Sequence, residues 1–301
     1  MKPSNIRTLL GRACFVRFTA GALLTVMAGY APAAIIVSSQ GFEPGGGYST
    51  TYLGTGQLEG QPAGHPTPWM RTVGASASTA NVQSTIVASG TQAVQLDRAA
   101  DANANDRWGV GVFGYPSLPI VSVDWDMRVT QTPDAGGTFG PYFGVEANDT
   151  DGPVGGGSVG LLGSLGVDAT TGEVLFQETG TGFLMPTGAT VNFDEWNHFL
   201  MIFDYTFNNY MYFLNGQMLG TEPFVDGPNL DQFTDASLFG LPAGPGASLS
   251  LPGRAFFDNY LVQEFSSKDA VPIIPEPTSW VLAAIALVAA SRFAPRHRVL
   301  G

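Results

Sequence analysis

Hydrophobic and polar residues alternate in several short stretches of the chain. In VSVDWDMRV, residues 121–129, the odd positions are apolar and the even positions are polar or charged. A period of two places the apolar side chains on one face of an extended strand. The stretch therefore predicts a half-buried strand, with Asp124 and Asp126 on its outward face.

Other stretches are short and apolar on both faces. HFLMIFDY, residues 198–205, has this character, which is typical of a strand covered on both sides. In YMYFLNGQML, which follows, Asn215 and Gly216 lie between apolar runs. An Asn-Gly pair favours a type I′ hairpin turn because both central residues of that turn need positive φ. We expect a hairpin here.

Further strands are predicted at residues 34–39, 81–89, 92–98, 143–147, 172–178 and 254–265. Gly and Pro separate them, and no long stretch has a helical period. Many short strands with such breaks predict an all-β fold, an antiparallel β-sandwich, over residues 34–265. With 39 Gly and 13% charged residues, the chain is rich in turns and weakly charged compared with the usual ~25%.

The N-terminal 33 residues have the three parts of a secretory signal peptide. A basic segment is followed by the apolar run FTAGALLTVMAGY and by Ala31-Pro32-Ala33, a small-residue cleavage pattern. The alternative is an N-terminal anchor, although the apolar run is shorter than the ~20 residues that a spanning helix needs. We expect a signal helix that is removed on export. The single cysteine, Cys14, would be lost with it, which excludes disulfides and Cys-ligated metals.

The remaining body is strongly acidic. Without the signal and the C-terminal segment, six Lys and Arg stand against 24 Asp and Glu, a net charge of −18. Phosphate backbones would be repelled, so we expect no nucleic-acid partner. Cations are better partners.

The C-terminus carries Pro275-Glu276-Pro277, an apolar run over residues 280–290 and then three arginines, Arg292, Arg296 and Arg298. The run is short for a membrane span, and the arginines would hold the C-terminus in the cytoplasm. These parts, in this order, resemble the PEP-CTERM sorting signal of bacterial exported proteins. The resemblance implies an exosortase partner, transient anchoring in the inner membrane and cleavage near the Pro-Glu-Pro, in bacteria that make exopolysaccharide. We expect residues 275–301 to form this sorting segment and residues 266–274 to be the linker before it. The alternative is an ordinary C-terminal anchor in which the Pro-Glu-Pro is incidental.

The segment EWNHFLMIFDYTFNNYMYFLNGQML resembles a central portion of concanavalin-like, laminin-G-like jelly rolls. The matching residues are Trp196, His198, Tyr212, Asn215 and Gly216. This resemblance implies a jelly-roll form of the sandwich, with glycan binding or adhesion as common uses, and a fold alone does not establish function. We expect His198 to be a packing residue.

In jelly rolls the first and last strands usually lie side by side, which would bring Glu43 of GFEP near Asp258 and Asn259 of FFDNYLV. The pairing resembles the structural calcium site of carbohydrate-binding jelly rolls, and oxygen ligands suit Ca²⁺. Carboxylates that only cap strand ends are the alternative. Calcium is the one cofactor that we expect.

Aromatic side chains in Gly/Pro-rich loops are candidate platforms for sugar rings. The candidates are Trp69, Trp108, Tyr115 and Tyr142. The alternative is that each ring plugs an end of the sandwich.

Glycoside hydrolysis needs two carboxyl groups across a cleft. Asp124 and Asp126 share one strand face and lie about 7 Å apart. Laminarinase-like jelly-roll enzymes carry Glu-x-Asp-x-x-Glu, and DWDMR contains no Glu. We therefore expect no catalytic residues. The predicted function is a non-enzymatic envelope or extracellular-matrix protein that binds exopolysaccharide or another glycan. A purely structural surface protein and a glycan-active hydrolase are the alternatives.

Overall fold

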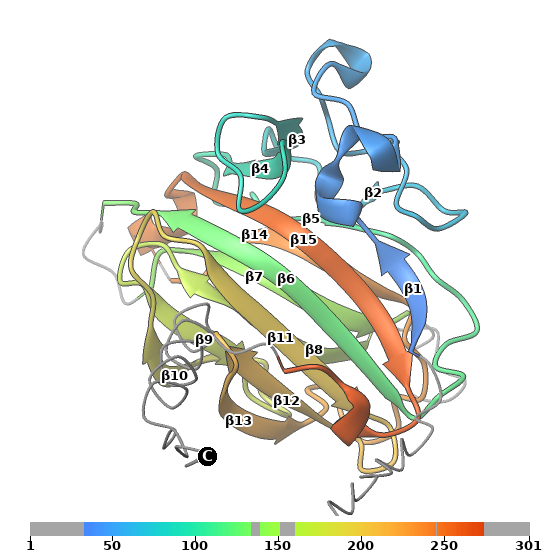
Figure 1. The fold of residues 1–301 in the computed structure, drawn as a ribbon. Helices are drawn as coiled ribbons and strands as arrows, with labels where there is room; N and C mark the ends of the chain where they lie inside the picture. Colours follow the sequence, from blue (N-terminus) through green and yellow to red (C-terminus); the bar gives the residue numbers. More distant parts are fainter. Residues whose placement is uncertain (1–32, 134–138, 151–159, 245, 274–301) are drawn as a thin grey trace, which may run out of the picture. The chain divides into compact units, whose positions relative to one another are not determined.

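The computed structural model describes residues 33–133, 139–150, 160–244 and 246–273. Two antiparallel sheets face each other and enclose the core (Figure 1), which confirms the predicted all-β antiparallel sandwich. The expected signal helix and C-terminal apolar helix lie outside the described residues.

The first sheet, here called sheet A, has the strand order β13-β12-β11-β6-β15-β4-β3, with β1 paired to β15. Its strands are β1 (Ala34–Ser38), β3 (Thr79–Gln83), β4 (Ala93–Arg98), β6 (Ile120–Thr130), β11 (Asn197–Asp204), β12 (Asn209–Leu214), β13 (Gln217–Pro223) and β15 (Gly253–Phe265). The first and last strands are thus neighbours, as the jelly-roll resemblance implied.

The second sheet, sheet B, has the order β10-β9-β8-β7-β14-β5-β2. Its strands are β2 (Met70–Val73), β5 (Asp106–Gly109), β7 (Pro141–Asp149), β8 (Gly160–Asp168), β9 (Glu173–Gln177), β10 (Leu184–Thr190) and β14 (Asp235–Pro242). Short 3-10 turns complete the described elements: η1 (Gln40–Phe42), η2 (Pro44–Gly46), η3 (Tyr52–Gly54), η4 (Gly246–Ser250) and η5 (Lys268–Ala270).

The alternation in β6 is confirmed. Its odd positions from Val121 to Val129 are buried in the core between the sheets, where they meet sheet B residues such as Val145 and Leu165. Trp125 stacks on Phe199 of β11 with ring centroids 5.5 Å apart. The predicted hairpin is also confirmed, because Asn215 and Gly216 both have positive φ, 50° and 79°.

One predicted strand is wrong beyond its first residues. The stretch 81–89 begins in β3, but β3 ends at Gln83. The Gln83 side chain accepts the N–H groups of Thr85 and Ile86 and donates to the Ile86 carbonyl, so it closes a local turn. Such local side-chain hydrogen bonds compete with strand pairing.

The outward face of β11 is also covered. Leu200 and Ile202 point away from the core and are 2% exposed, packed with Phe213, Phe265 and Val271. Val271 follows η5 and is 6% exposed. Val271 of the predicted 266–274 linker therefore lies on the outer face of sheet A.

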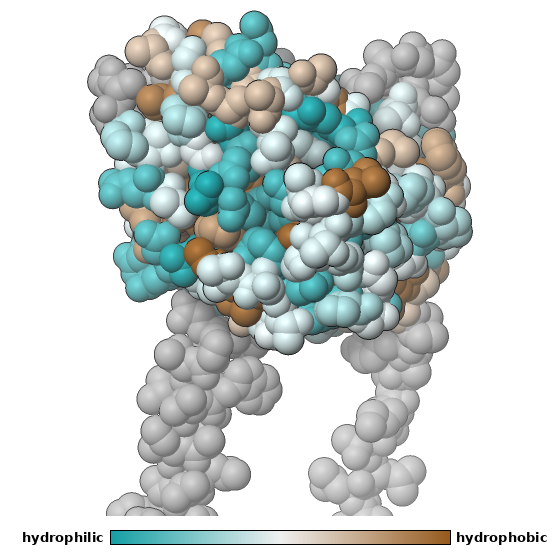
Figure 2. Space-filling view, turned by 90° about the horizontal axis from the view of Figure 1, so that it is seen from above, coloured by the Kyte–Doolittle hydropathy of each residue, from teal (hydrophilic) through white to brown (hydrophobic). Residues whose placement is uncertain are grey.

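Seen from above the view of Figure 1, the surface is mostly hydrophilic, with hydrophobic residues scattered in small groups (Figure 2). Scattered apolar residues are normal on a soluble domain, and only a large contiguous patch would indicate a partner surface. This view therefore directs attention to hollows in the surface.

Candidate functional site

Polar side chains gather on the outer face of sheet B, the face turned away from sheet A. On β7, Val145 and Ala147 point into the core, so Glu146 and Asn148 point outward. The neighbouring strand β14 pairs Asp235 with Asn148 and Ser237 with Glu146. Directly opposed residues of an antiparallel pair share a face. The register therefore brings four polar side chains together.

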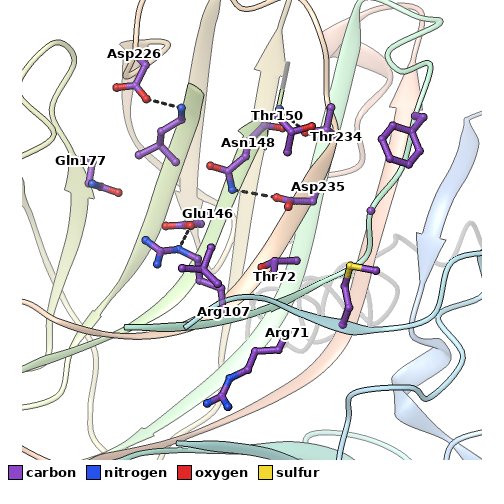
Figure 3. Close-up of a pocket in the computed structure, with 15 residues that line it drawn as sticks. Arg71, Thr72, Arg107, Glu146, Asn148, Thr150, Gln177, Asp226, Thr234 and Asp235 are labelled. Carbon is purple, nitrogen blue, oxygen red and sulfur yellow. Dashed lines mark hydrogen bonds and ion pairs between the residues drawn. The ribbon is translucent and has the colours of Figure 1, made fainter. Parts of the chain in front are cut away.

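These side chains form specific contacts (Figure 3). Arg107 of β5 makes an ion pair with Glu146 through Nε. The Asn148 amide donates to Asp235 Oδ1 over 3.0 Å. Burial raises the pKa of Asp235 to about 6; the Asn148 hydrogen bond opposes this rise and the nearby charge of Glu146 adds to it. The cluster therefore presents fixed donors and acceptors.

A hollow of about 560 Å³ lies over this cluster, within the usual size range of small-molecule sites. Its polar lining also includes Thr72, Thr150 and Thr234, and its apolar lining includes Met70, Val73, Leu161 and Phe113. The Phe113 side chain is 78% exposed. An exposed ring beside fixed polar groups suits a ligand with both apolar faces and hydroxyl groups.

A second hollow of about 410 Å³ lies on the same sheet. Its lining includes Tyr142 and Leu241, near the opposite ends of β7 and β14 from Asn148 and Asp235. Phe183 also lines it and is 70% exposed. Gln177 of β9 lines both hollows, which makes them neighbours along the sheet.

The rings expected as exposed platforms are mostly in the core. Trp69 is 1% exposed and donates to the Tyr48 hydroxyl, and Trp108 is 3% exposed with the Arg71 guanidinium over its ring. Tyr142 is also buried, although it lines the second hollow, and Tyr115 is partly buried against the core. Exposure was therefore wrongly inferred, because a Gly/Pro-rich neighbourhood marks where a strand begins or ends and not which way its side chains point.

Sequence reasoning missed Phe113 and Phe183. Both lie in Gly-rich segments, GVFGYP and TGTGFL, so the rule that selected the Trp and Tyr residues would have selected them as well. It also missed the polar cluster, because only the cross-strand register joins residues from β5, β7 and β14.

The residues of the calcium prediction do meet. Asp258 accepts the backbone N–H groups of Ala88 and Ser89, while Glu43 accepts those of Thr91 and Gln92, so both carboxylates hold one loop. Burial alone would raise the pKa of Glu43, but the hydrogen bonds that it accepts lower this pKa below its ordinary value. Burial raises the pKa of Asp258 to about 6.

A calcium ion at this loop would need more ligands than these side chains. Within the described part of the chain, no group of three or more His, Cys, Asp or Glu side chains is placed to hold a metal ion. Two carboxylates and the Asn259 amide are hard oxygen donors of the right kind, but Ca²⁺ takes six to eight oxygens, so backbone carbonyls would have to complete the set. Calcium stays a prediction.

Asp124 and Asp126 lie on the outer face of sheet A, on either side of His198. His198 Nδ1 is 3.1 Å from Asp126, and its Nε2 is 3.6 Å from Asp124. Burial opposes protonation, but Asp126 and Asp124 together raise the pKa of His198. Burial raises the pKa of Asp124 to about 6 despite the favourable charge of His198. The three residues line neither of the two hollows.

The sorting residues Pro275, Glu276, Pro277, Arg292, Arg296 and Arg298 lie outside the described residues. In the described ranges, no helix has the length and apolar character needed to cross a bilayer.

No protein-family model matches the chain, and no curated protein matches it. Among solved structures, the chain is similar to an endo-β-1,4-glucuronan lyase from the fungus Trichoderma reesei, with 12% identity, a TM-score of 0.46 and coverage of 63% of this chain and 88% of that one. It is also similar to the cellulose induced protein Cip1, with 15% identity, a TM-score of 0.47 and coverage of 73% and 96%.

A third similar structure is the binding domain of botulinum neurotoxin serotype G, with 10% identity, a TM-score of 0.40 and coverage of 78% of this chain and 50% of that one. At these identities and TM-scores the similarities do not indicate a function for this chain.

Proposed function

We propose that the protein binds a glycan, without chemical turnover, on the outer face of sheet B. One observation carries this proposal: a polar cluster from three adjacent strands, Arg107, Glu146, Asn148 and Asp235, lies under a hollow with an exposed aromatic rim. Sugars combine apolar ring faces with hydroxyl groups, and both features have partners here.

The rigidity of the cluster supports the proposal. Its side chains project from paired strands and hold one another by an ion pair and a hydrogen bond, so little conformational freedom remains to be lost on binding. A binding site on strands is positioned more accurately than a site on loops.

Affinity electrophoresis and calorimetry with native exopolysaccharide and a glycan panel test the proposal. Phe113→Ala should weaken binding roughly tenfold, or about 1.4 kcal/mol. Phe207→Ala is the matched control, because Phe207 is 69% exposed and lines neither hollow. If neither exopolysaccharide nor any panel glycan binds, the alternative of a structural surface protein replaces this one.

Glycoside hydrolysis at the same face is a second candidate function. Two carboxyl groups, Glu146 and Asp235, flank the cluster as diagonal cross-strand neighbours, roughly 7–8 Å apart between Cα atoms. Their environments differ, since Glu146 is paired with Arg107 and the pKa of Asp235 is raised to about 6. Unequal carboxyl groups around a cleft are the pattern of glycosidases.

Turnover separates the two candidates. A hydrolase would release reducing ends from a bound polysaccharide and would lose this activity in Asp235→Asn while still binding. If the polysaccharide binds but no product forms even at high protein concentration, the hydrolase hypothesis is excluded.

We also propose that the protein is exported to the envelope or matrix as an exosortase substrate. The basic-apolar-small N-terminus and the Pro275-Glu276-Pro277 tail support this. The intact mass of the protein from its native host tests it. A species that starts near Ala34 and ends near residues 275–277 is expected, and one that retains residues 280–301 contradicts sorting by cleavage.

A further inference from the structure

Gln177 lies at the junction of the two hollows and has an unused acceptor. Its amide nitrogen donates to the Gly182 carbonyl over 3.2 Å, which fixes the orientation of the side chain. Its Oε1 is buried and has no hydrogen-bond partner among the described residues. A buried acceptor without a partner destabilises a protein, so it needs an explanation.

A ligand hydroxyl would satisfy this acceptor after a small turn of the side chain, because Oε1 itself has almost no accessible surface in the free protein. Gln177 is the residue that lines both hollows, so a ligand that reaches Oε1 would lie where they meet. The outward position of β7 between Glu146 and Tyr142 is Gly144, which pairs with Gly166 of β8. Both glycines are buried, and the Tyr142 ring lies against Gly166, so the two hollows meet beside Gln177 and not over the glycines.

The length of this path sets the size of the ligand. Tyr142 and Asn148 line different hollows and are six residues apart on β7. At a rise of ~3.4 Å per residue, this separation is about 20 Å. Phe113 and Phe183 are the exposed rings of the two hollows. A single sugar cannot reach both.

The charges of the path disfavour an anionic ligand. In the first hollow Arg107 is paired with Glu146, and Arg71 is paired with Asp106. Asp226 and Asp235 add further carboxyl groups to its lining, whereas the described residues that line the second hollow include no charged one. The net charge of −18 on the body adds long-range repulsion of anions.

We infer that the outer face of sheet B binds an extended, uncharged glycan chain along β7, with a hydroxyl at the middle of the chain donating to Gln177 Oε1. This inference rests on the proposed glycan binding and adds the class of ligand, its length and its central contact.

The first experiment measures affinity against chain length and charge. The probes are cello-, manno- and xylo-oligosaccharides of one to six units, oligogalacturonides of the same lengths, and native exopolysaccharide divided by anion exchange into neutral and acidic fractions. Neutral probes should bind at least a hundredfold more tightly as the chain lengthens, and the neutral fraction should bind better than the acidic one. Tighter binding of the acidic fraction, or equal affinity for one unit and six, overturns the inference.

The second experiment uses Gln177→Met, which keeps the length of the side chain but removes the acceptor. The substitution also removes the donor to the Gly182 carbonyl. It should weaken binding at least tenfold while the Tm changes little, because loss of the unpaired acceptor offsets loss of that hydrogen bond. Gln263→Met on the outer face of sheet A is the matched control and should leave binding unchanged. A Gln177→Met protein that binds normally overturns the role of Gln177.

The outcomes distinguish a failure of the proposed glycan binding from a failure of the inference on ligand charge and length. If no glycan of any charge or length binds, the proposed function itself fails. If glycans bind but follow the opposite charge or length dependence, only the present inference fails.

Discussion

The two outer faces of the sandwich differ in what covers them. On sheet A, the apolar residues Leu200 and Ile202 lie beneath Val271, and thus beneath the chain's own C-terminal segment. On sheet B, the face carries two hollows with exposed rings, and the Gln177 Oε1 atom that lies between them has no hydrogen-bond partner among the described residues. An atom of this kind is not unique to sheet B, since His198 Nε2 on sheet A also has no such partner. Sheet A also carries a hollow of about 660 Å³ at another place, lined by residues such as Asp97, Thr130 and Arg254. Among the described residues, the chain thus covers the β11–β12 part of sheet A, whereas the sheet B hollows stay open. That contrast points to sheet B as the ligand face.

The largest expected effect tests whether sheet A is closed. Ile202→Asp places a carboxyl group without a partner in a 2% exposed site and should cost roughly 4 kcal/mol or more. Thermal unfolding should show the loss. Val73→Asp, at a 45% exposed position on the rim of the sheet B hollow, is the matched control and should change stability by less than about 0.5 kcal/mol. Equal effects would contradict the contrast between the faces.

The second effect concerns the buried carboxyl group of sheet B. The pKa of Asp235 is about 6 in the folded protein against an ordinary 3.8, so the native state binds more protons between these values and stability falls as pH rises through them. Asp235→Asn removes this loss. The variant should equal the wild type at pH 4 and be more stable at pH 7 by up to roughly 3 kcal/mol.

Denaturant unfolding from pH 4 to pH 8 measures the difference for Asp235→Asn. Asp124 and Asp258, whose pKa values are also raised to about 6, titrate in both proteins and should cancel from the difference. If the difference in unfolding free energy between the variant and the wild type does not change with pH, folding does not raise the pKa of Asp235.

The third effect weakens the cover of sheet A. Val271→Ala removes two buried methyl groups and should cost about 1.6 kcal/mol by the usual value per buried carbon. Urea unfolding at pH 7 should detect it. An unchanged midpoint would mean that the segment after Phe265 does not cover the face in solution, and sheet A would then be open as well.

The smallest effect concerns proton binding on sheet A. His198 should titrate above the ordinary histidine pKa because of Asp126 and Asp124, and His65 below it because of burial. Two-dimensional NMR can follow both rings, with His198→Gln giving the assignment. Asp126→Asn should lower the upper pKa and leave the lower one unchanged. If Asp126→Asn also changes the pKa of His65, the effect of Asp126 is not confined to its contact with His198.

The sheets also differ in how well the sequence predicted them. Sheet A could be largely predicted, since β6 alternates, β11 and β15 are apolar, and Asn215-Gly216 fixes the hairpin between β12 and β13. In sheet B only β7 and β9 matched predicted stretches. Gly144, Gly163 and Gly166 interrupt the apolar pattern of β7 and β8, and β5 has only four residues. Short or glycine-containing strands give little periodic signal.

Local patterns and composition therefore predict the all-β class, the inward and outward positions of the clearly alternating strand, the turn at Asn215-Gly216 and the acidic character of the body. Each of these depends on neighbouring residues or on composition. The folded structure is needed to show that Trp69 and Trp108 are buried, that Glu43 and Asp258 hold one loop, and that Arg107, Glu146, Asn148, Asp235 and Gln177 share one face. These facts depend on strand order and register between segments far apart in the chain, and local patterns do not specify them.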